Sequence, residues 1–298
     1  MRTATPQEML SLVQQHPNDH VHVVDLPYRL ASWAFDYPGN SYAWRDASGE
    51  LLAWAVLQTP FWTVDLACRP DLEPSLFPEI LAWVDSAARL LVDTPSGRPA
   101  CYANVFPHQE RRRAALETAG WACQSEVGED SWEEVLLVCD LKSKKGMATG
   151  VPPPGYSLRP LAGAAEVGAY VDLHQAVFES KNMTLPWRET TLQQPDYRPE
   201  LDLVIDAPGG GLAAFCIGWL SPDRLTGQIE PLGVAREYRR LNLGRLLLEE
   251  CLRRMHALGA EQVLVLTDNF RGPALSLYQS AGFQVREPVL VYRKDFTG

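Results

Sequence analysis

The stretch from Gln228 to Leu258 constrains the fold most strongly, because a short basic loop in it joins a strand pattern to a helix pattern. Its first part, with Ile229, Leu232 and Val234, is apolar and strand-like. Its last part has apolar residues at 247, 248, 251, 252, 255 and 258, the spacing of a helix with one buried face. The stretch therefore predicts a β-strand that leads into an α-helix, as in an α/β fold.

The loop that joins strand and helix, residues 239–244, has the properties of an anion site. The first N–H groups of a helix lack intrahelical partners, and the helix dipole makes that end partly positive. Arg239 and Arg240 add fixed positive charge where a pyrophosphate would lie. Because the whole chain has a net charge of −10, we expect a dedicated anion site here, and neither nucleic acid nor a membrane surface as partner.

Arg239, Asn242 and Gly244 resemble the acyl-CoA-binding motif of the GNAT superfamily of N-acetyltransferases, Arg/Gln-x-x-Gly-x-Gly/Ala. Asn242 replaces the first glycine, and asparagine is the non-glycine residue that most readily adopts left-handed backbone geometry. Further along, Ala274–Phe283 is similar to the Ala-x-x-Leu-Tyr-x-x-x-Gly-Phe signature of the family. Asn269 precedes this second motif, further from the tyrosine than is usual.

The resemblance implies acetyl-CoA-dependent transfer of an acetyl group to the primary amine of a small molecule, with no metal. Tyr278 would be the general acid toward the departing thiolate, and Glu230 the general base, directly or through water. The residues implied for acetyl-CoA binding are Leu232, Gly233, Val234, Arg239, Arg240, Leu241, Asn242, Leu243, Gly244, Arg245 and Asn269.

These roles have alternatives. Glu230 could instead orient the substrate or cap the structure, and Asn269 could stabilise a turn. Further candidates for the base are Asp202 and Glu179, on the presumed acceptor side, and His174, for which packing within a helix is the alternative. For the whole protein, the alternatives are a non-catalytic acyl-CoA-binding or regulatory module and a protein N-acetyltransferase.

The order of predicted elements indicates two copies of one domain. Residues 1–141 and 155–298 share the order strands, long helix, strand, helix, strand, while 142–154 (KSKKGMATGVPPP) reads as an exposed linker. We therefore expect an α/β chain of two tandem GNAT-like domains, each a mixed, mostly antiparallel sheet flanked by helices. This layout is similar to that of the mycothiol synthases.

The first copy lacks the residues of the basic loop. When Leu66–Cys68 is aligned with Leu232–Val234, the loop becomes EPSLFP at 73–78, with two prolines that have no N–H and with Glu73 in place of arginine. Leu116 takes the position of the tyrosine. We therefore expect a degenerate first domain that binds no pyrophosphate.

Two local patterns at the N-terminus give sharp expectations. Thr5–Glu8 is a capping box with proline at the first helical position, which predicts a helix start. Residues 20–26 (HVHVVDL) alternate like a strand.

The cysteines and the hydropathy pattern indicate the cellular compartment of the protein. The six cysteines follow no metal-ligand spacing and lie in apolar contexts, which indicates core thiols and a reducing cytoplasm. The N-terminus lacks an apolar signal core, and we find no apolar run long enough for a membrane span.

Overall fold

The structure is a computed structural model that describes residues 3–128, 131–143 and 150–296. Contacts divide the chain into two compact units. The first comprises 1–135, 268–270 and 288–298, and the second comprises 136–267 and 271–287. Residues 144–149 of the expected linker lie outside the described residues.

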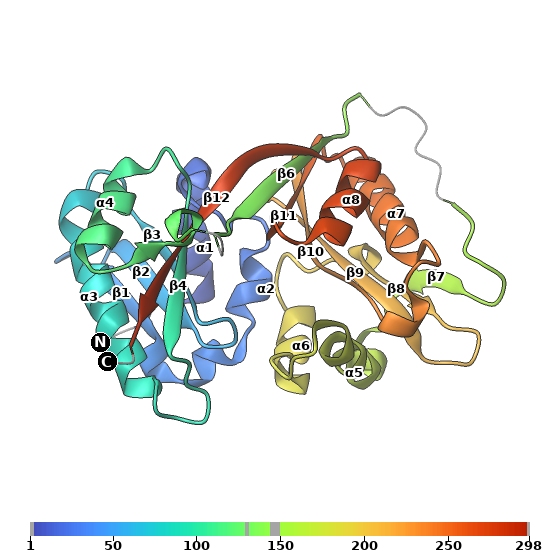
Figure 1. Ribbon diagram of the computed structural model, residues 1–298, viewed down its shortest axis with the longest axis horizontal. Helices are drawn as coiled ribbons and strands as arrows, with labels where there is room; N and C mark the ends of the chain where they lie inside the picture. Colours follow the sequence, from blue (N-terminus) through green and yellow to red (C-terminus); the bar gives the residue numbers. More distant parts are fainter. Residues whose placement is uncertain (1–2, 129–130, 144–149, 297–298) are drawn as a thin grey trace. The chain divides into compact units, whose positions relative to one another are not determined.

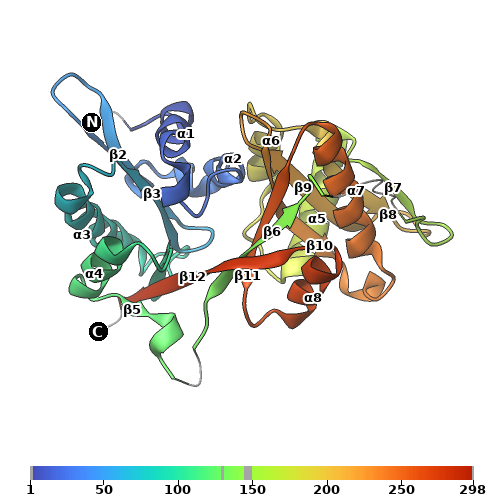
Figure 2. The same cartoon turned by 90° about the horizontal axis from the view of Figure 1, so that it is seen from above.

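The first unit is a mixed sheet with helices on both faces (Figures 1 and 2). Its strand order is β1-β2-β3-β4-β12, and β5 also pairs with β12. Neighbours are antiparallel except β3 and β4, which are parallel. The strands are β1 (Ser41–Arg45), β2 (Leu51–Gln58), β3 (Thr63–Cys68), β4 (Ala100–Val105), β5 (Ala122–Cys123) and the end of β12 (Gln284–Asp295). The helices are α1 (Pro6–Gln15), α2 (Leu26–Leu30), α3 (Glu73–Leu91) and α4 (Glu110–Thr118).

Strand β2 shows why this sheet needs helices on both faces. Successive side chains of a strand point to opposite faces, and β2 is apolar at nearly every position. Ala55 and Leu57 pack into a core with α3, whereas Trp54 and Val56 pack into a second core with α1. An apolar run of this kind is typical of a strand covered on both sides.

The second unit repeats this arrangement, in the order β6-β11-β10-β9-β8-β7. Pairs β7/β8, β8/β9 and β9/β10 are antiparallel, and β10/β11 is parallel. The strands are β6 (Glu134–Asp140), β7 (Ser157–Pro160), β8 (Asp202–Asp206), β9 (Leu212–Leu220), β10 (Thr226–Val234) and β11 (Gln262–Asp268). The helices are α5 (Val167–Phe178), α6 (Leu185–Leu192), α7 (Leu243–Ala257) and α8 (Gly272–Ser280).

Glycines let α7 lie close to the second sheet. A Cβ atom at Gly218 would lie 2.4 Å from Met255 Cε, and one at Gly227 would lie 2.7 Å from Met255 Sδ. Both distances are shorter than real contacts, so a larger residue at either position would have to displace the end of the Met255 side chain. The long helix predicted after the basic loop therefore packs directly against β9 and β10.

The two halves of the sequence exchange strands, which the simple division into 1–141 and 155–298 did not include. Most of β6 comes from the first half of the chain but belongs to the second unit. The end of β12 comes from the second half but completes the first unit, where Leu290–Asp295 pair with Ala100–Val105.

Among the N-terminal expectations, the capping box is confirmed and the strand at 20–26 is wrong. Helix α1 begins at Pro6, the Thr5 side chain accepts from the Glu8 N–H, and Glu8 accepts from the Thr5 N–H. Residues 20–25 form bends and irregular backbone instead, because α2 begins at Leu26 and the polar side chains of the segment are part of a buried cluster described below. No helix in the described ranges is long and apolar enough to cross a membrane.

Candidate active site

The central strands of the second unit separate at one end. Strands β10 and β11 pair at three positions, Thr226–Gln228 with Gln262–Leu264. Beyond Gln228, β10 continues for six residues to Val234, pairing only with β9 on its other side. In the described part of the chain, the edge of Leu232–Val234 that points toward β11 is therefore left without strand pairing.

The backbone at this edge is held in place by close packing. A Cβ atom at Gly233 would lie 2.6 Å from Phe215 Cζ and 2.7 Å from Val177 Cγ1. Only glycine allows the strand to lie this close to α5 and β9. Three of the residues predicted to bind acetyl-CoA, Leu232, Gly233 and Val234, thus lie on a closely packed strand, and their edge toward β11 has no strand partner among the described residues.

Two residues of the basic loop have the left-handed backbone geometry that glycine adopts most easily. Asn242 has φ 63° and ψ 13°, and Arg240 has φ 65°, both in the left-handed region. Asn242 is the N-cap of α7, so the N–H groups of Leu243, Gly244 and Arg245 fall in the first turn, where helices leave donors unpaired. The replacement of glycine by asparagine therefore leaves the left-handed turn intact.

The loop is anchored to the strand that precedes it. The Arg239 Nε donates to the Val234 carbonyl at 3.3 Å, and a Cβ at Gly244 would lie 3.2 Å from Val234 Cγ2. Arg239, Arg240 and Asn242 are exposed, so both guanidinium groups reach solvent beside the helix N-terminus. Positive side chains and helix dipole thus act on the same region.

Tyr278 lies in α8 and is buried, with its ring 5.7 Å from that of Phe283 in an edge contact. Burial raises the pKa of Tyr278, and the negative charge of Glu230 adds to the effect. The phenol therefore stays protonated at neutral pH and keeps a proton to donate. The structure brings these two predicted catalytic residues within electrostatic reach of each other.

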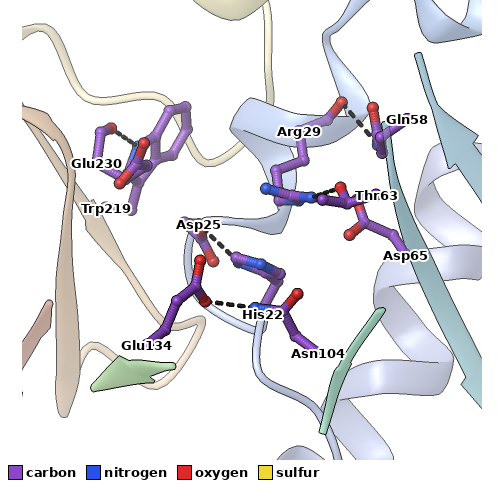
Figure 3. Close-up of polar contacts among 10 residues, drawn as sticks. All are labelled: His22, Asp25, Arg29, Gln58, Thr63, Asp65, Asn104, Glu134, Trp219 and Glu230. Atoms are coloured by element: carbon purple, nitrogen blue, oxygen red, sulfur yellow. Dashed lines mark hydrogen bonds and ion pairs between the residues drawn. The ribbon is translucent and has the colours of Figure 1, made fainter. Parts of the chain in front are cut away.

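Glu230 lies where the pairing of β10 with β9 is interrupted. The register shifts between Ile229 and Leu232, so Glu230 and Pro231 form a bulge rather than a regular alternation. The Trp219 Nε1 donates to the Glu230 carbonyl at 2.8 Å and fixes the bulge (Figure 3). A bulge re-aims a side chain, so the orientation of Glu230 could not be derived from strand alternation.

Of the other candidates for the base, Asp202 and His174 are buried and make contacts within the fold, whereas Glu179 is exposed. Asp202 is fully buried, forms an ion pair with Arg188 and accepts from Tyr197 Oη at 2.6 Å. Burial lowers the pKa of His174 to about 4, and its ring stacks on Phe215 at 5.5 Å. Glu179 is the left-handed C-cap of α5 and faces solvent.

The last two residues predicted to bind acetyl-CoA, Arg245 and Asn269, lie in different units. Arg245 is exposed and its Nε donates to Glu249 at 2.7 Å, so its charge is shared within α7. Asn269 follows β11, and its N–H donates to the Glu133 carbonyl at 2.9 Å. Contacts group Asn269 with the first unit, so its assignment to cofactor binding stays a prediction.

In the first unit, the segment aligned with the basic loop is helical. Residues 73–78, expected as a loop, form the start of α3. The Glu73 carboxylate pairs with Arg112, Oε1 lying 3.1 Å from Nε and Oε2 3.2 Å from Nη2. Leu116, in the tyrosine position, is part of the apolar core.

Sequence reasoning missed a polar cluster in the first unit. His22, Arg29 and Asp65 lie close together around a cavity beside β3 and β4. His22 and Arg29 come from the segment misassigned as a strand and from the short helix after it. Histidine–aspartate spacing in HVHVVD is the one signal that could have suggested the cluster.

Comparison with known proteins agrees with this geometry. Residues 169–283 match the sequence profile of the Acetyltransferase (GNAT) family. The fold is similar to a GCN5-related N-acetyltransferase from Sphaerobacter thermophilus, with a TM-score of 0.66 and 17% identity over 100% of this chain and 95% of that one. A tandem GNAT protein from the clavulanic acid biosynthesis pathway has a TM-score of 0.66 and 16% identity, over 99% and 95% of the two chains.

A GNAT-family acetyltransferase from Colwellia psychrerythraea has a TM-score of 0.59 and 11% identity, over 98% of each chain. At such identities the likeness shows the fold alone. Comparison with curated protein sequences gives no match.

Proposed function

We propose that this chain is a tandem acetyltransferase of the GNAT superfamily with acetyl-CoA as acyl donor, and that its second unit acetylates the primary amine of a small molecule. The observation that carries the proposal is the strand–loop–helix geometry of residues 229–245. An unpaired strand edge, a left-handed basic loop and a helix N-terminus follow one another there. These are the parts needed to hold a long ligand that ends in a pyrophosphate.

In this proposal, the backbone of Leu232–Val234 binds the pantetheine arm, and the amides of 240–245 bind the pyrophosphate. Arg239 and Arg240 neutralise its charge from the solvent side. Gly244 matters for a different reason. Its missing Cβ lets the first turn of α7 lie against Val234, which brings strand edge and helix terminus together.

The chemistry requires two proton transfers. The amine nitrogen attacks the thioester carbonyl, the C–S bond breaks, and the acetyl group moves to nitrogen. Glu230 takes the proton from the amine, directly or through a water, and Tyr278 gives its proton to the departing sulfur. A buried, protonated phenol near a carboxylate suits this division of roles.

Calorimetric titration of acetyl-CoA tests the binding half. We expect one site per chain, abolished by Arg239→Glu/Arg240→Glu. A matched control is Arg224→Glu/Arg253→Glu, which makes the same charge change elsewhere in the second unit and should leave binding unchanged. Two sites would contradict the expectation that the first unit binds no pyrophosphate, and unchanged binding in the loop variant would refute the assigned site.

Steady-state kinetics test the catalytic half. Tyr278→Phe should lower kcat by roughly 10²–10⁴-fold, the usual contribution of general acid catalysis, with little change in acetyl-CoA affinity. Glu230→Gln should remove the lower limb of the pH–rate profile if Glu230 is the base. Full activity of Tyr278→Phe would remove this residue from the mechanism.

The other functions predict different results. A non-catalytic acyl-CoA-binding module would bind acetyl-CoA at one site but acetylate none of the amines in a broad screen. A protein N-acetyltransferase would modify peptides and leave small amines unchanged. We place the protein in the cytoplasm, and its six buried free thiols support a reducing compartment.

A further inference from the structure

The bulge in β10 reverses the alternation of side chains along the last part of the strand. Ile229 lies opposite Gly218 of β9, and Leu232 lies opposite Cys216. Within this interval two residues of β10 therefore face one residue of β9, which is the defining count of a β-bulge. Because directly opposed residues share a face of the sheet, the extra residue moves every later side chain of β10 to the other face.

The reversed alternation decides how the strand edge at 232–234 packs. A Cβ atom at Gly233 would lie 2.7 Å from Val177 Cγ1, so this position faces α5. Val234 faces α7 instead, since its Cγ2 would lie 3.2 Å from a Cβ atom at Gly244. A slip of one residue would exchange these faces and press a larger side chain against α5. The packing at the two glycines therefore holds the register of β10 beyond the bulge.

A side chain of the neighbouring strand holds the bulge itself. Trp219 Nε1 of β9 donates to the Glu230 carbonyl at 2.8 Å (Figure 3). Trp219 is 0% exposed, so this bond lies in the interior, where a hydrogen bond is stronger than in water. A bulge re-aims the side chains that it carries. The direction of the Glu230 carboxylate therefore depends on the indole N–H.

The indole ring is in turn supported by a second aromatic ring and a buried ion pair. The ring of Tyr197 meets that of Trp219 in an edge contact, with centroids 6.5 Å apart. Tyr197 Oη donates to Asp202 at 2.6 Å, and Asp202 pairs with Arg188. A buried ion pair gives little stability over apolar side chains of the same volume. Holding the ring that fixes the bulge therefore gives this pair a role that stability does not.

We propose that Trp219 is a positioning residue for Glu230, the base of the proposed acetyl transfer, with Tyr197 as the support of its ring. The role rests on the proposed function, and Trp219 acts through the backbone of Glu230 rather than on the reacting atoms. Loss of the indole N–H frees the bulge, while the glycine packing beyond it keeps the strand edge in register. The rate of the chemical step should therefore fall without a loss of acetyl-CoA binding.

The first test compares crystal structures of the wild type and Trp219→Phe, which keeps an aromatic ring and removes the N–H. We expect the strand edge at 232–234 unmoved and the Glu230 carboxylate displaced by about 1 Å or more, a shift that can slow a reaction roughly 10²-fold. Trp54→Phe is the matched control, because Trp54 is 1% exposed and donates its N–H to the Met9 carbonyl in the first unit. A Glu230 carboxylate that keeps its position in Trp219→Phe would overturn the proposal.

Two further replacements address the ring and its support. Benzothienylalanine at position 219 has sulfur in place of the N–H in a ring of the same shape, so it isolates the hydrogen bond if Trp219→Phe does not fold. It should displace Glu230 in the same way. Tyr197→Leu leaves the N–H but removes the ring beside it, and should let the indole move. An indole that stays in place in this variant would remove Tyr197 from the proposal.

Kinetics separate the role of Trp219 from the proposed function. CoA release from acetyl-CoA is followed with ethanolamine, phenylethylamine and glucosamine as acceptors. Trp219→Phe should lower kcat roughly 10–100-fold, with an unchanged KM for acetyl-CoA. The lower limb of the pH–rate profile should remain, because the Glu230 carboxylate is still present.

The two failures are distinguishable. Full activity of Glu230→Gln would refute the assigned base, and with it the proposed mechanism. Full activity of Trp219→Phe beside an inactive Glu230→Gln would refute the positioning role alone. If no amine is turned over, the result counts against the proposed function, and the crystal structures still decide whether Trp219 places Glu230.

Discussion

The buried ion pair between Arg188 and Asp202 gives the sharpest stability prediction for the second unit. Both side chains are 0% exposed, and Arg188 Cζ lies 3.8 Å from the ring centroid of Tyr170. Burial alone would lower the pKa of Arg188, but Asp202 holds it above its ordinary value, so the guanidinium stays charged. The pair ties α6 to β8, and Tyr197 Oη adds a hydrogen bond to the carboxylate.

Asp202→Asn keeps the shape of the side chain and removes its charge. The Arg188 guanidinium is then buried without a counter-charge, and breaking a buried pair in this way costs about 3–5 kcal/mol of unfolding free energy. For a unit of this size, Tm should fall by roughly 6–20 °C. Replacing both partners, as in Arg188→Met/Asp202→Leu, should cost less than either single change, because no charge is left alone.

Urea denaturation gives the free energies, and hydrogen exchange of peptides covering 185–206 shows where protection is lost. Tyr197→Phe is the matched control, since it removes a hydrogen bond to the same carboxylate but leaves the ion pair, at roughly 1.5–3 kcal/mol. The reasoning fails if Asp202→Asn costs less than about 1 kcal/mol, or if the double variant loses as much as the two single variants together.

Three further predictions concern the loop, the strand edge and the histidines. Asn242→Gly should bind acetyl-CoA at least as well as the wild type, whereas Asn242→Val should bind roughly tenfold more weakly, because a β-branched residue resists φ 63°; calorimetry measures both. Gly233→Ala should destabilise the protein by about 1–3 kcal/mol, because the new methyl group meets Phe215, and thermal unfolding would show an unchanged Tm if the contact is absent. Burial holds the pKa values of His20 and His174 at about 3 and 4, below the ordinary value, so only the unfolded chain takes up these protons. Stability present above pH 6.5 should therefore fall by up to about 1.4 kcal/mol per pH unit for each histidine as pH drops toward 5, and His20→Leu should remove one such contribution to the slope.

Local patterns predicted the elements of the second unit closely. The strand and the helix predicted within 228–258 are β10 and α7, and α7 begins at Leu243, inside the predicted loop 239–244. These segments combine strong hydrophobic periodicity with residues of special backbone preference, such as Asn242. Propensity and tertiary structure agree there, so a single sequence suffices.

The misassigned segment at 20–26 shows the limit of pattern reading. Its alternation of histidine and valine satisfies the strand rule, but His20 and His22 turn inward to a polar cavity. Alternation reports which side chains share a face and says nothing of the partner that a strand requires. The bulge at Glu230 could not be predicted for a related reason, because the register shift that forms it arises from the pairing of β10 with β9.

The exchange of strands between the halves has a consequence for synthesis and truncation. The first unit needs Leu290–Asp295, so its sheet cannot be completed until all residues up to Asp295 have left the ribosome. Deleting residues 289–298 should therefore damage the first unit more than the second unit. Neither half could be lost as a gene fragment without removing a strand from the other unit, which gives a reason why the first unit, which lacks the basic loop, remains attached.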